Sequence, residues 1–306
     1  MRVNIRNMEH ERKVYTKKPL SVDEQVALLK SRGLQLPPGD EELLRYYLHN
    51  VNYYHLSIYF KFFQQNDIFT KGTTFSEVLS VYIFDNKLRQ LLLELLERLE
   101  KSLKCRIAYS LTTDVNDSHC HLNPKLYSTE QTCREIISMF EDEVKKNSRE
   151  TSIYHYKKYY QEPELPPLWS VIELLSFGQT VKLFRSLSLT NRKIIARTFD
   201  IDETLLSSWM HGLSVIRNHC AHHSRLWNRD LTLKPKIGKR FKVFFTDNSR
   251  IFNQFIILQI ILNNVNPDSS WQDILIELIN EYKILPKNMG FPDDWKTKLS
   301  EIQKFR

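Results

Sequence analysis

The longest regular pattern in the chain is a series of apolar residues at three- and four-residue steps, the spacing of one face of an α-helix. The series consists of Val81, Phe84, Leu88, Leu92, Leu95, Leu99, Leu103 and Ile107. Thr74 and Glu77 have the spacing of a capping box at its start. The opposite face carries three acid–base pairs four residues apart with the acid first, which is the stabilising order: Glu94–Arg98, Glu97–Lys101 and Glu100–Lys104. The pattern predicts a helix of roughly thirty residues at the centre of a helical bundle.

Capping residues and chain breaks predict further helices. Ser21 and Glu24 form another capping box, and Gly33 suits the end of the helix that they begin. Asp40 is placed to cap the next helix. Apolar spacing also predicts helices over residues 132–146, 168–177 (ended by Gly178), 190–199 and 203–224. Because no segment shows a convincing two-residue alternation, the predicted fold class is all-α.

Composition excludes several classes of protein. The chain has 7 glycines in 306 residues, and none is spaced for a glycine-rich phosphate loop. The four cysteines show neither a CxxC pair nor a disulfide pattern. The polar N-terminus lacks the apolar centre of a signal peptide, and the most apolar stretch, 252–262, is too short to cross a bilayer. We therefore expect a reduced, soluble, cytoplasmic protein with no membrane association, whose basic residues 1–18 are loosely ordered.

The positive charge of the chain is concentrated in one segment. The formal net charge is +8, and residues 217–250 contain nine Lys or Arg but only two Asp. Such a segment is either a solvated basic loop or a surface for a polyanion. The polyanion interpretation assigns the backbone of RNA to Arg225, Arg229, Lys236, Lys239 and Arg240. Trp227 is then a candidate stacking platform, although the apolar Leu226 beside it favours burial.

The predicted helix over 203–224 combines a core stripe with a polar face. At about 100° per residue, its apolar residues share one arc, with His223 beside that arc and His219 at its flank. The apolar residues are Leu205, Trp209, Leu213, Ile216 and Cys220. Arg217, Asn218, Ala221 and His222 fill the opposite arc, which is otherwise the ordinary solvated side of an amphipathic helix.

The residues of the polar arc are those that RNA cleavage by the 2′-hydroxyl requires. Arg217 offers a planar cation for phosphate oxygens, and His222 can transfer a proton near neutral pH. Asn218, one turn before His222, could orient its ring. This chemistry needs no metal or cofactor, and we expect none.

Two other chemistries are weaker. A zinc site would pair His219 with His222 or His223, but the HExxH pattern is absent, and consecutive His119, Cys120 and His121 cannot surround one ion. Cysteine-based hydrolysis would need Cys220, which lies in the apolar stripe.

The string RNHCAHHSRLWNR, residues 217–229, resembles the abortive-infection, Abi-like branch of the HEPN ribonuclease superfamily, whose motif is R-x4-H. Further blocks in the same order extend the resemblance over about residues 15–295, among them VNYYHLSIYF, YIFDNKLRQLLLELLERLEKSL, PPLWSVIELLSFGQ and MGFPDDW. The resemblance implies a HEPN-type helical bundle with added N- and C-terminal helices. One domain would span 19–298, with its HEPN core over roughly 75–265.

The resemblance also implies a function. Proteins of this kind are bacterial toxins that cut RNA without metal, and some are restrained by an antitoxin, either an RNA or a protein. Arg217 and His222 would be the catalytic pair, with Asn218 beside them. The family usually acts as a homodimer with a composite site. A separation of about 140° between Arg217 and His222 on one helix independently favours such sharing. The alternative is a non-catalytic HEPN module that binds RNA or a protein.

Overall fold

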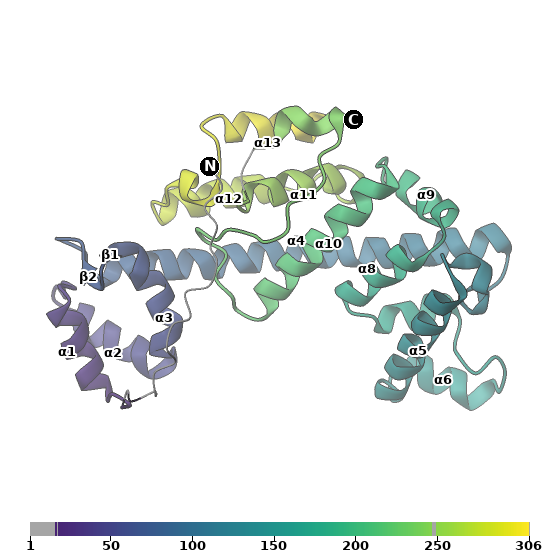
Figure 1. Ribbon diagram of the computed structural model, residues 1–306, viewed down its shortest axis with the longest axis horizontal. Coiled ribbons are helices and arrows are strands. Elements are labelled where there is room, and N and C mark those ends of the chain that lie inside the picture. Colours follow the sequence, from purple (N-terminus) through teal and green to yellow (C-terminus); the bar gives the residue numbers. More distant parts are fainter. Residues whose placement is uncertain (1–15, 17, 247–248, 306) are drawn as a thin grey trace, which may run out of the picture. The chain divides into compact units, whose positions relative to one another are not determined.

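The computed structural model describes residues 16, 18–246 and 249–305, so most of the N-terminal segment 1–18 lies outside the described residues. The chain divides into two compact units, residues 1–82 and 83–306. Apart from one two-stranded hairpin, the regular structure of the described residues is helical (Figure 1). The all-α fold class is therefore confirmed. The domain limits 19–298 and 75–265 stay predictions.

The first unit contains three helices and the hairpin. These elements are α1 (Val22–Ser31), α2 (Asp40–Asn50), α3 (Tyr53–Phe60), the 3-10 turn η1 (Lys61–Phe63), β1 (Gln64–Gln65) and β2 (Ile68–Phe69). The Ser21–Glu24 capping box is confirmed. Asn66 and Asp67 both have positive φ, which suits a two-residue hairpin turn that the sequence analysis missed.

Asp40 caps a different helix from the one expected. It is the first residue of α2, and its carboxylate accepts hydrogen bonds from the Ser76 backbone N–H at 3.0 Å and the Ser76 hydroxyl at 2.6 Å. Ser76 lies in the first turn of α4 (Phe75–Val115), which Thr74 and Glu77 cap as predicted. The prediction that Asp40 caps α2 was wrong, because its carboxylate is hydrogen-bonded to Ser76 of α4 instead.

Helix α4 is the predicted long helix, but its 41 residues exceed the expected thirty. All eight apolar positions of the pattern are buried, and the three acid–base pairs form. The last pair is not on a solvated face, because the side chains of Glu100 and Lys104 are only 15% and 8% exposed. The prediction that this pair lies on the solvated face was therefore wrong.

The second unit continues after α4 with further helices. In order they are η2 (Cys120–Leu122), η3 (Pro124–Leu126), α5 (Glu130–Lys146), α6 (Thr151–Tyr159), α7 (Leu168–Val171), η4 (Ile172–Leu174), α8 (Phe177–Ser186), α9 (Leu189–Arg197), α10 (Glu203–Ala221), η5 (Lys239–Phe244), α11 (Phe252–Val265), α12 (Trp271–Glu281), η6 (Pro286–Met289) and α13 (Trp295–Lys304). Helix α10 packs against α8, α9 and α11 (Figure 1).

The predicted helix over 168–177 is wrong. The chain makes the short elements α7 and η4, and Leu175 is then extended. Ser176 begins α8 with a capping box to Gln179, so Gly178 lies in the first turn of a helix instead of ending one.

The apolar stretch 252–262 is buried throughout within α11. Its polar members have partners: the Gln259 side-chain oxygen accepts from Trp271 Nε1 at 2.9 Å and from Gln272 Nε2 at 2.8 Å. No helix of the described residues is long and apolar enough to cross a membrane.

Candidate active site

Helix α10 positions the candidate site. The side chain of Asp202 accepts from the Thr204 N–H at 2.8 Å and caps the first turn. Four of the five predicted stripe residues are buried, and Leu205 is half-buried. The stripe fixes the rotation of the helix, which leaves Asn218 and His222 exposed.

The helix ends earlier than predicted, and its end explains where His222 and His223 lie. Ala221 is the last helical residue, and His222 is the C-cap. The N–H of His223 donates to Cys220 O at 3.2 Å, and that of Ser224 donates to His219 O at 2.8 Å. These two bonds form a Schellman motif. His223 has φ +54° and is exposed, so its expected place beside the core was wrong.

Arg217 is held toward helix α4. Its side chain is 34% exposed, and its Nε lies 3.9 Å from Glu100 Oε2. Glu100 also pairs with Lys104 Nζ at 3.4 Å, and Lys104 Nζ in turn donates to Glu173 O. One side of the guanidinium therefore faces the Glu100 carboxylate, while part of the guanidinium remains accessible to solvent. Arg217 and His222 thus differ in surroundings, one half-buried beside a carboxylate and the other exposed at the helix end.

His219 lies in the last turn of α10 and is half-buried. Burial lowers the pKa of His219, and the nearby Arg229 and His222 lower it further. Arg229 is half-buried, and its Nη1 donates to Arg225 O at 3.3 Å. The structure therefore brings Arg229 from the basic segment close to the end of the motif.

A buried carboxylate fixes the loop after the motif. Asp85 on α4 is 0% exposed and pairs with Arg89 Nη1 at 2.5 Å. Its oxygens accept from the N–H groups of Leu226 at 3.1 Å and Trp227 at 2.7 Å. Sequence analysis missed this anchor, although an Asp and an Arg four residues apart within an apolar helix could have signalled a buried pair.

The other predicted RNA-binding residues, Lys236, Lys239 and Arg240, follow the motif in the chain and lie near the first half of α10. The chain after the motif runs back, because the Lys236 N–H donates to Ser208 Oγ at 2.9 Å and its carbonyl accepts from Trp209 Nε1 at 2.7 Å. Lys239 and Arg240 are exposed on η5, and Arg240 Nη1 pairs with Asp200 at 2.8 Å. The basic segment therefore extends along α10 instead of forming one cluster.

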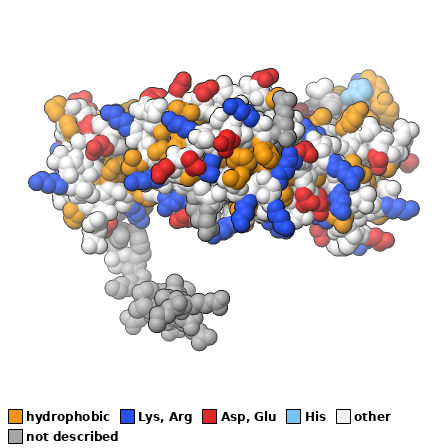
Figure 2. All heavy atoms as spheres, turned by 90° about the horizontal axis from the view of Figure 1, so that it is seen from above, with side chains coloured by type: hydrophobic (Ala, Val, Ile, Leu, Met, Phe, Trp, Pro, Cys, Tyr) orange, Lys and Arg blue, Asp and Glu red, His pale blue; other side chains and the backbone are white. Residues whose placement is uncertain are grey.

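Two further features limit the chemistry and the binding surface. Trp227 is only 5% exposed, so it is not a stacking platform, and burial raises the pKa of the Cys220 thiol to about 12, which disfavours it as a nucleophile. The face of the molecule that Figure 2 shows carries Lys and Arg side chains interspersed with Asp and Glu.

Two of the three consecutive residues His119, Cys120 and His121 are buried. His119 is bonded to Ser118 Oγ at 2.9 Å and to the Tyr156 hydroxyl at 3.1 Å, and His121 packs on Phe140. The described residues contain no group of three His, Cys, Asp or Glu side chains that could hold a metal ion.

Comparison with known families assigns the chain. The family model described as Abi-like protein matches residues 46–228, which is more than half of the chain and includes Arg217, Asn218 and His222. The chain therefore belongs to the Abi-like family, and this membership suggests a role in abortive infection. No curated protein and no solved structure matches the chain.

Proposed function

We propose that the chain is a metal-independent endoribonuclease toxin of a bacterial anti-phage system, with Arg217 and His222 as its catalytic pair. The observation that carries this proposal is the end of α10. A histidine is exposed at the helix cap, and an anchored arginine lies one and a half turns before it, in the R-x4-H spacing. Family membership supports the role in abortive infection.

The proposed reaction uses the 2′-hydroxyl of the RNA itself. His222 takes the proton of that hydroxyl, and the oxygen then attacks the adjacent phosphorus. Arg217 binds the phosphate oxygens and stabilises the charge that develops on them. The bond to the 5′ oxygen breaks, and that oxygen takes a proton from water, while His222 releases the proton of the 2′-hydroxyl to solvent. The products are a 2′,3′-cyclic phosphate and a 5′-hydroxyl.

Asn218 is a positioning residue in this scheme. The His222 N–H donates to the Asn218 carbonyl oxygen at 2.9 Å, so their recorded contact is through the backbone. The exposed Asn218 side chain is free to orient the phosphate or the imidazole. Asn218→Ala should therefore lower kcat less than His222→Ala does, with the pH profile of kcat separating an effect on the imidazole from one on binding.

The surroundings of Arg217 and His222 support a homodimer with a composite site. Arg217 leans toward Glu100 of α4, whereas His222 is exposed at the cap. A separation of about 140° around the helix also favours a site in which a partner copy supplies one of the two side chains. In a homodimer, Arg217 of one copy and His222 of the other serve one phosphate.

The first experiment incubates purified protein with total RNA in excess EDTA. Arg217→Ala and His222→Ala should each cut about 10²–10⁴ times more slowly than the unaltered protein. Arg197→Ala and His223→Ala are matched controls, because both residues are exposed and lie outside the proposed pair. Equal cleavage by His222→Ala would refute the assignment. RNA binding by an unaltered protein that never cuts would favour the non-catalytic module.

A mixing experiment tests the composite site. Arg217→Ala and His222→Ala proteins are inactive alone, but mixed dimers should regain part of the activity because one of their sites keeps an Arg217 and a His222. Light scattering measures the oligomeric state. A monomer with full activity would contradict the homodimer.

The RNA partner and an antitoxin complete the proposal. Arg225, Arg229, Lys236, Lys239 and Arg240 are assigned to the RNA backbone, and each contact with a single strand should add about −0.7 to the log–log salt slope. A slope of zero would exclude the basic segment. An antitoxin, RNA or protein, is expected to cover the same surface.

A further inference from the structure

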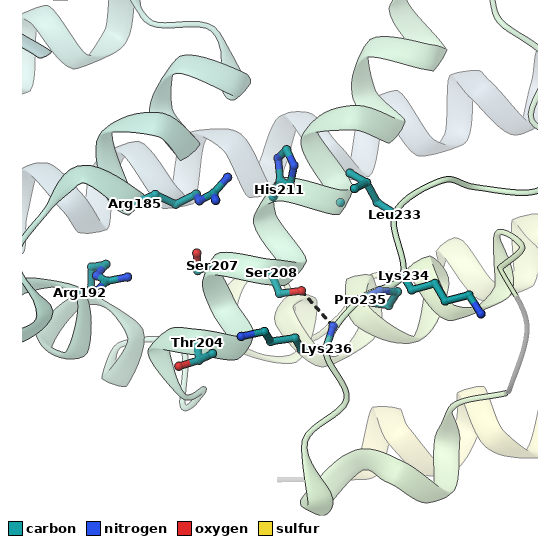
Figure 3. Close-up of a pocket in the computed structure, with 11 residues that line it drawn as sticks. Arg185, Arg192, Thr204, Ser207, Ser208, His211, Leu233, Lys234, Pro235 and Lys236 are labelled. Carbon is teal, nitrogen blue, oxygen red and sulfur yellow. Dashed lines mark hydrogen bonds between the residues drawn. The ribbon is translucent and has the colours of Figure 1, made fainter. Parts of the chain in front are cut away.

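A second site lies beside the first half of α10. It is a cavity of about 310 Å³, bordered by α8, α9, α10 and the returning segment 233–236. Figure 3 shows the Arg185 side chain of α8 pointing toward His211 of α10, and Ser207 of α10 lines the same cavity. The Lys236 side chain extends toward Thr204, whereas Lys234 points away.

The lining of this cavity is cationic. Arg185, Arg192, His211 and Lys236 come from separate elements, and no acidic residue lines it among the residues that the structure describes. Arg185, Arg192 and Lys236 form no ion pair with the described part of the chain. The cations therefore repel one another without internal compensation, which an anion between them would relieve.

Arg192 has an unmet hydrogen bond at this cavity. Its Nε is buried and has no hydrogen-bond partner among the described residues. An unsatisfied buried donor is unfavourable by about 1–3 kcal/mol, and more for a charged group.

Hydroxyl groups supply the neutral donors. Ser207 lines the cavity, and Ser208 Oγ accepts from the Lys236 N–H, which leaves the Ser208 hydroxyl hydrogen free to donate. The Thr204 hydroxyl, which also lines the cavity, already donates to Glu203 Oε1 at 3.1 Å. Planar arginine cations with hydroxyl donors are the groups that bind phosphate oxygens. This donor set excludes a cationic ligand and favours a phosphate.

The cavity is in register with the candidate active site. Residues at three- and four-residue steps share one face of α10, and Thr204, Ser208, His211, Val215, Asn218 and His222 follow these steps. His211 and His222 are eleven residues apart, or about 16 Å along a helix at about 1.5 Å per residue. An RNA strand of a few nucleotides spans that distance.

We propose that this cavity binds a phosphate group of the RNA strand, a few nucleotides from the phosphate that Arg217 and His222 cleave. The inference rests on the proposed function for its ligand, because it takes RNA as the substrate. A free phosphate or nucleotide offers the same chemistry, so the test includes both sources.

The test measures binding in the His222→Ala background, in which the RNA stays intact. A labelled RNA dodecamer is titrated by fluorescence anisotropy at several salt concentrations, and inorganic phosphate is titrated by calorimetry. Arg185→Gln and Arg192→Gln should each weaken RNA binding about tenfold and make the salt slope shallower by about 0.7. Lys182→Gln and Lys193→Gln are matched controls, because these lysines are exposed on α8 and α9 and do not line the cavity.

The outcomes separate the possibilities. If the arginine variants bind RNA as tightly as the lysine controls, the RNA site is overturned, and a loss of phosphate binding alone would assign the cavity to a free anion. Arg185 is exposed, so Arg185→Gln tests the proposal even if Arg192→Gln fails to fold. If the arginine variants lose RNA binding while the unaltered protein cuts no RNA, the cavity is upheld and the ribonuclease proposal fails by itself.

Discussion

The buried carboxylate of Asp85 should be one of the strongest determinants of stability in this protein. Asp85→Ala leaves Arg89, which is 4% exposed, without its counter-charge, and breaking a buried pair in this way destabilises by about 3–5 kcal/mol. It also removes the acceptor of the Leu226 and Trp227 N–H groups, at about 1–3 kcal/mol for each that stays buried. The total approaches the whole free energy of unfolding of a typical domain, about 5–15 kcal/mol.

Two further variants separate the charge from the hydrogen bonds. Asp85→Asn keeps an acceptor oxygen, so it should retain part of the loop contact while losing the ion pair. The double variant Asp85→Leu with Arg89→Leu removes both charges, and it should be more stable than Asp85→Ala because no unpaired charge stays buried. It should still fall below the unaltered protein, since the two N–H groups lose their acceptor.

Urea unfolding measures these effects through the midpoint at constant m-value. Asp114→Ala is the control, because Asp114 is exposed on the same helix and its loss should change the free energy of unfolding by less than about 0.5 kcal/mol. An Asp85→Ala protein within 1 kcal/mol of the unaltered one would refute the reasoning. The same variant should also lose RNA cleavage, because the segment after His222 loses its anchor.

Three other predictions test separate parts of the structure. Burial lowers the pKa of His121 to about 4, so the unfolded chain binds a proton below about pH 6.5 that the folded chain takes up only near pH 4. The free energy of unfolding should therefore decline as the pH falls from about 6.5 to about 4, and in urea titrations His121→Leu should lack that decline. In the native protein Ellman's reagent should modify the exposed Cys105, and rapid modification of Cys220, whose pKa is raised to about 12, would contradict its burial. His223→Gly should raise the free energy of unfolding by about 1 kcal/mol because glycine adopts positive φ without strain, whereas a lower Tm would contradict the observed helix end.

The parts of the fold that were predictable depend on local sequence. Helix α4 follows from an apolar spacing that is repeated over many turns and from capping residues three positions apart. The buried stripe of α10 follows from the same rule. Such patterns determine which face is buried before any partner is known.

The errors arose where a distant contact or a backbone conformation decided the outcome. Asp85 contacts Leu226 across 141 residues of sequence, and no local pattern encodes that pairing. His223 adopts the left-handed conformation without being a glycine, so the helix end at Ala221 was not visible. The Asp40 carboxylate accepts a hydrogen bond from the Ser76 hydroxyl and does not cap its own helix.

In the candidate site, too, local features were predictable from the sequence and long-range contacts were not. The identities and spacing of Arg217 and His222 could be read from the sequence, whereas the ion pair of Arg217 with Glu100 could not. The cationic cavity was also invisible, because α8, α9 and the returning segment contribute its arginines and lysine from separate stretches of the chain.

The central claim is that Arg217 and His222 use the 2′-hydroxyl of RNA without a metal ion. Its most direct test compares an RNA that the protein cuts in excess EDTA with the same RNA carrying a 2′-O-methyl group at the cleaved position. We expect the methylated RNA to stay intact and the unmodified RNA to yield a 2′,3′-cyclic phosphate and a 5′-hydroxyl. Cleavage of the methylated RNA at the same bond, or cleavage only when a divalent metal is supplied, would contradict it.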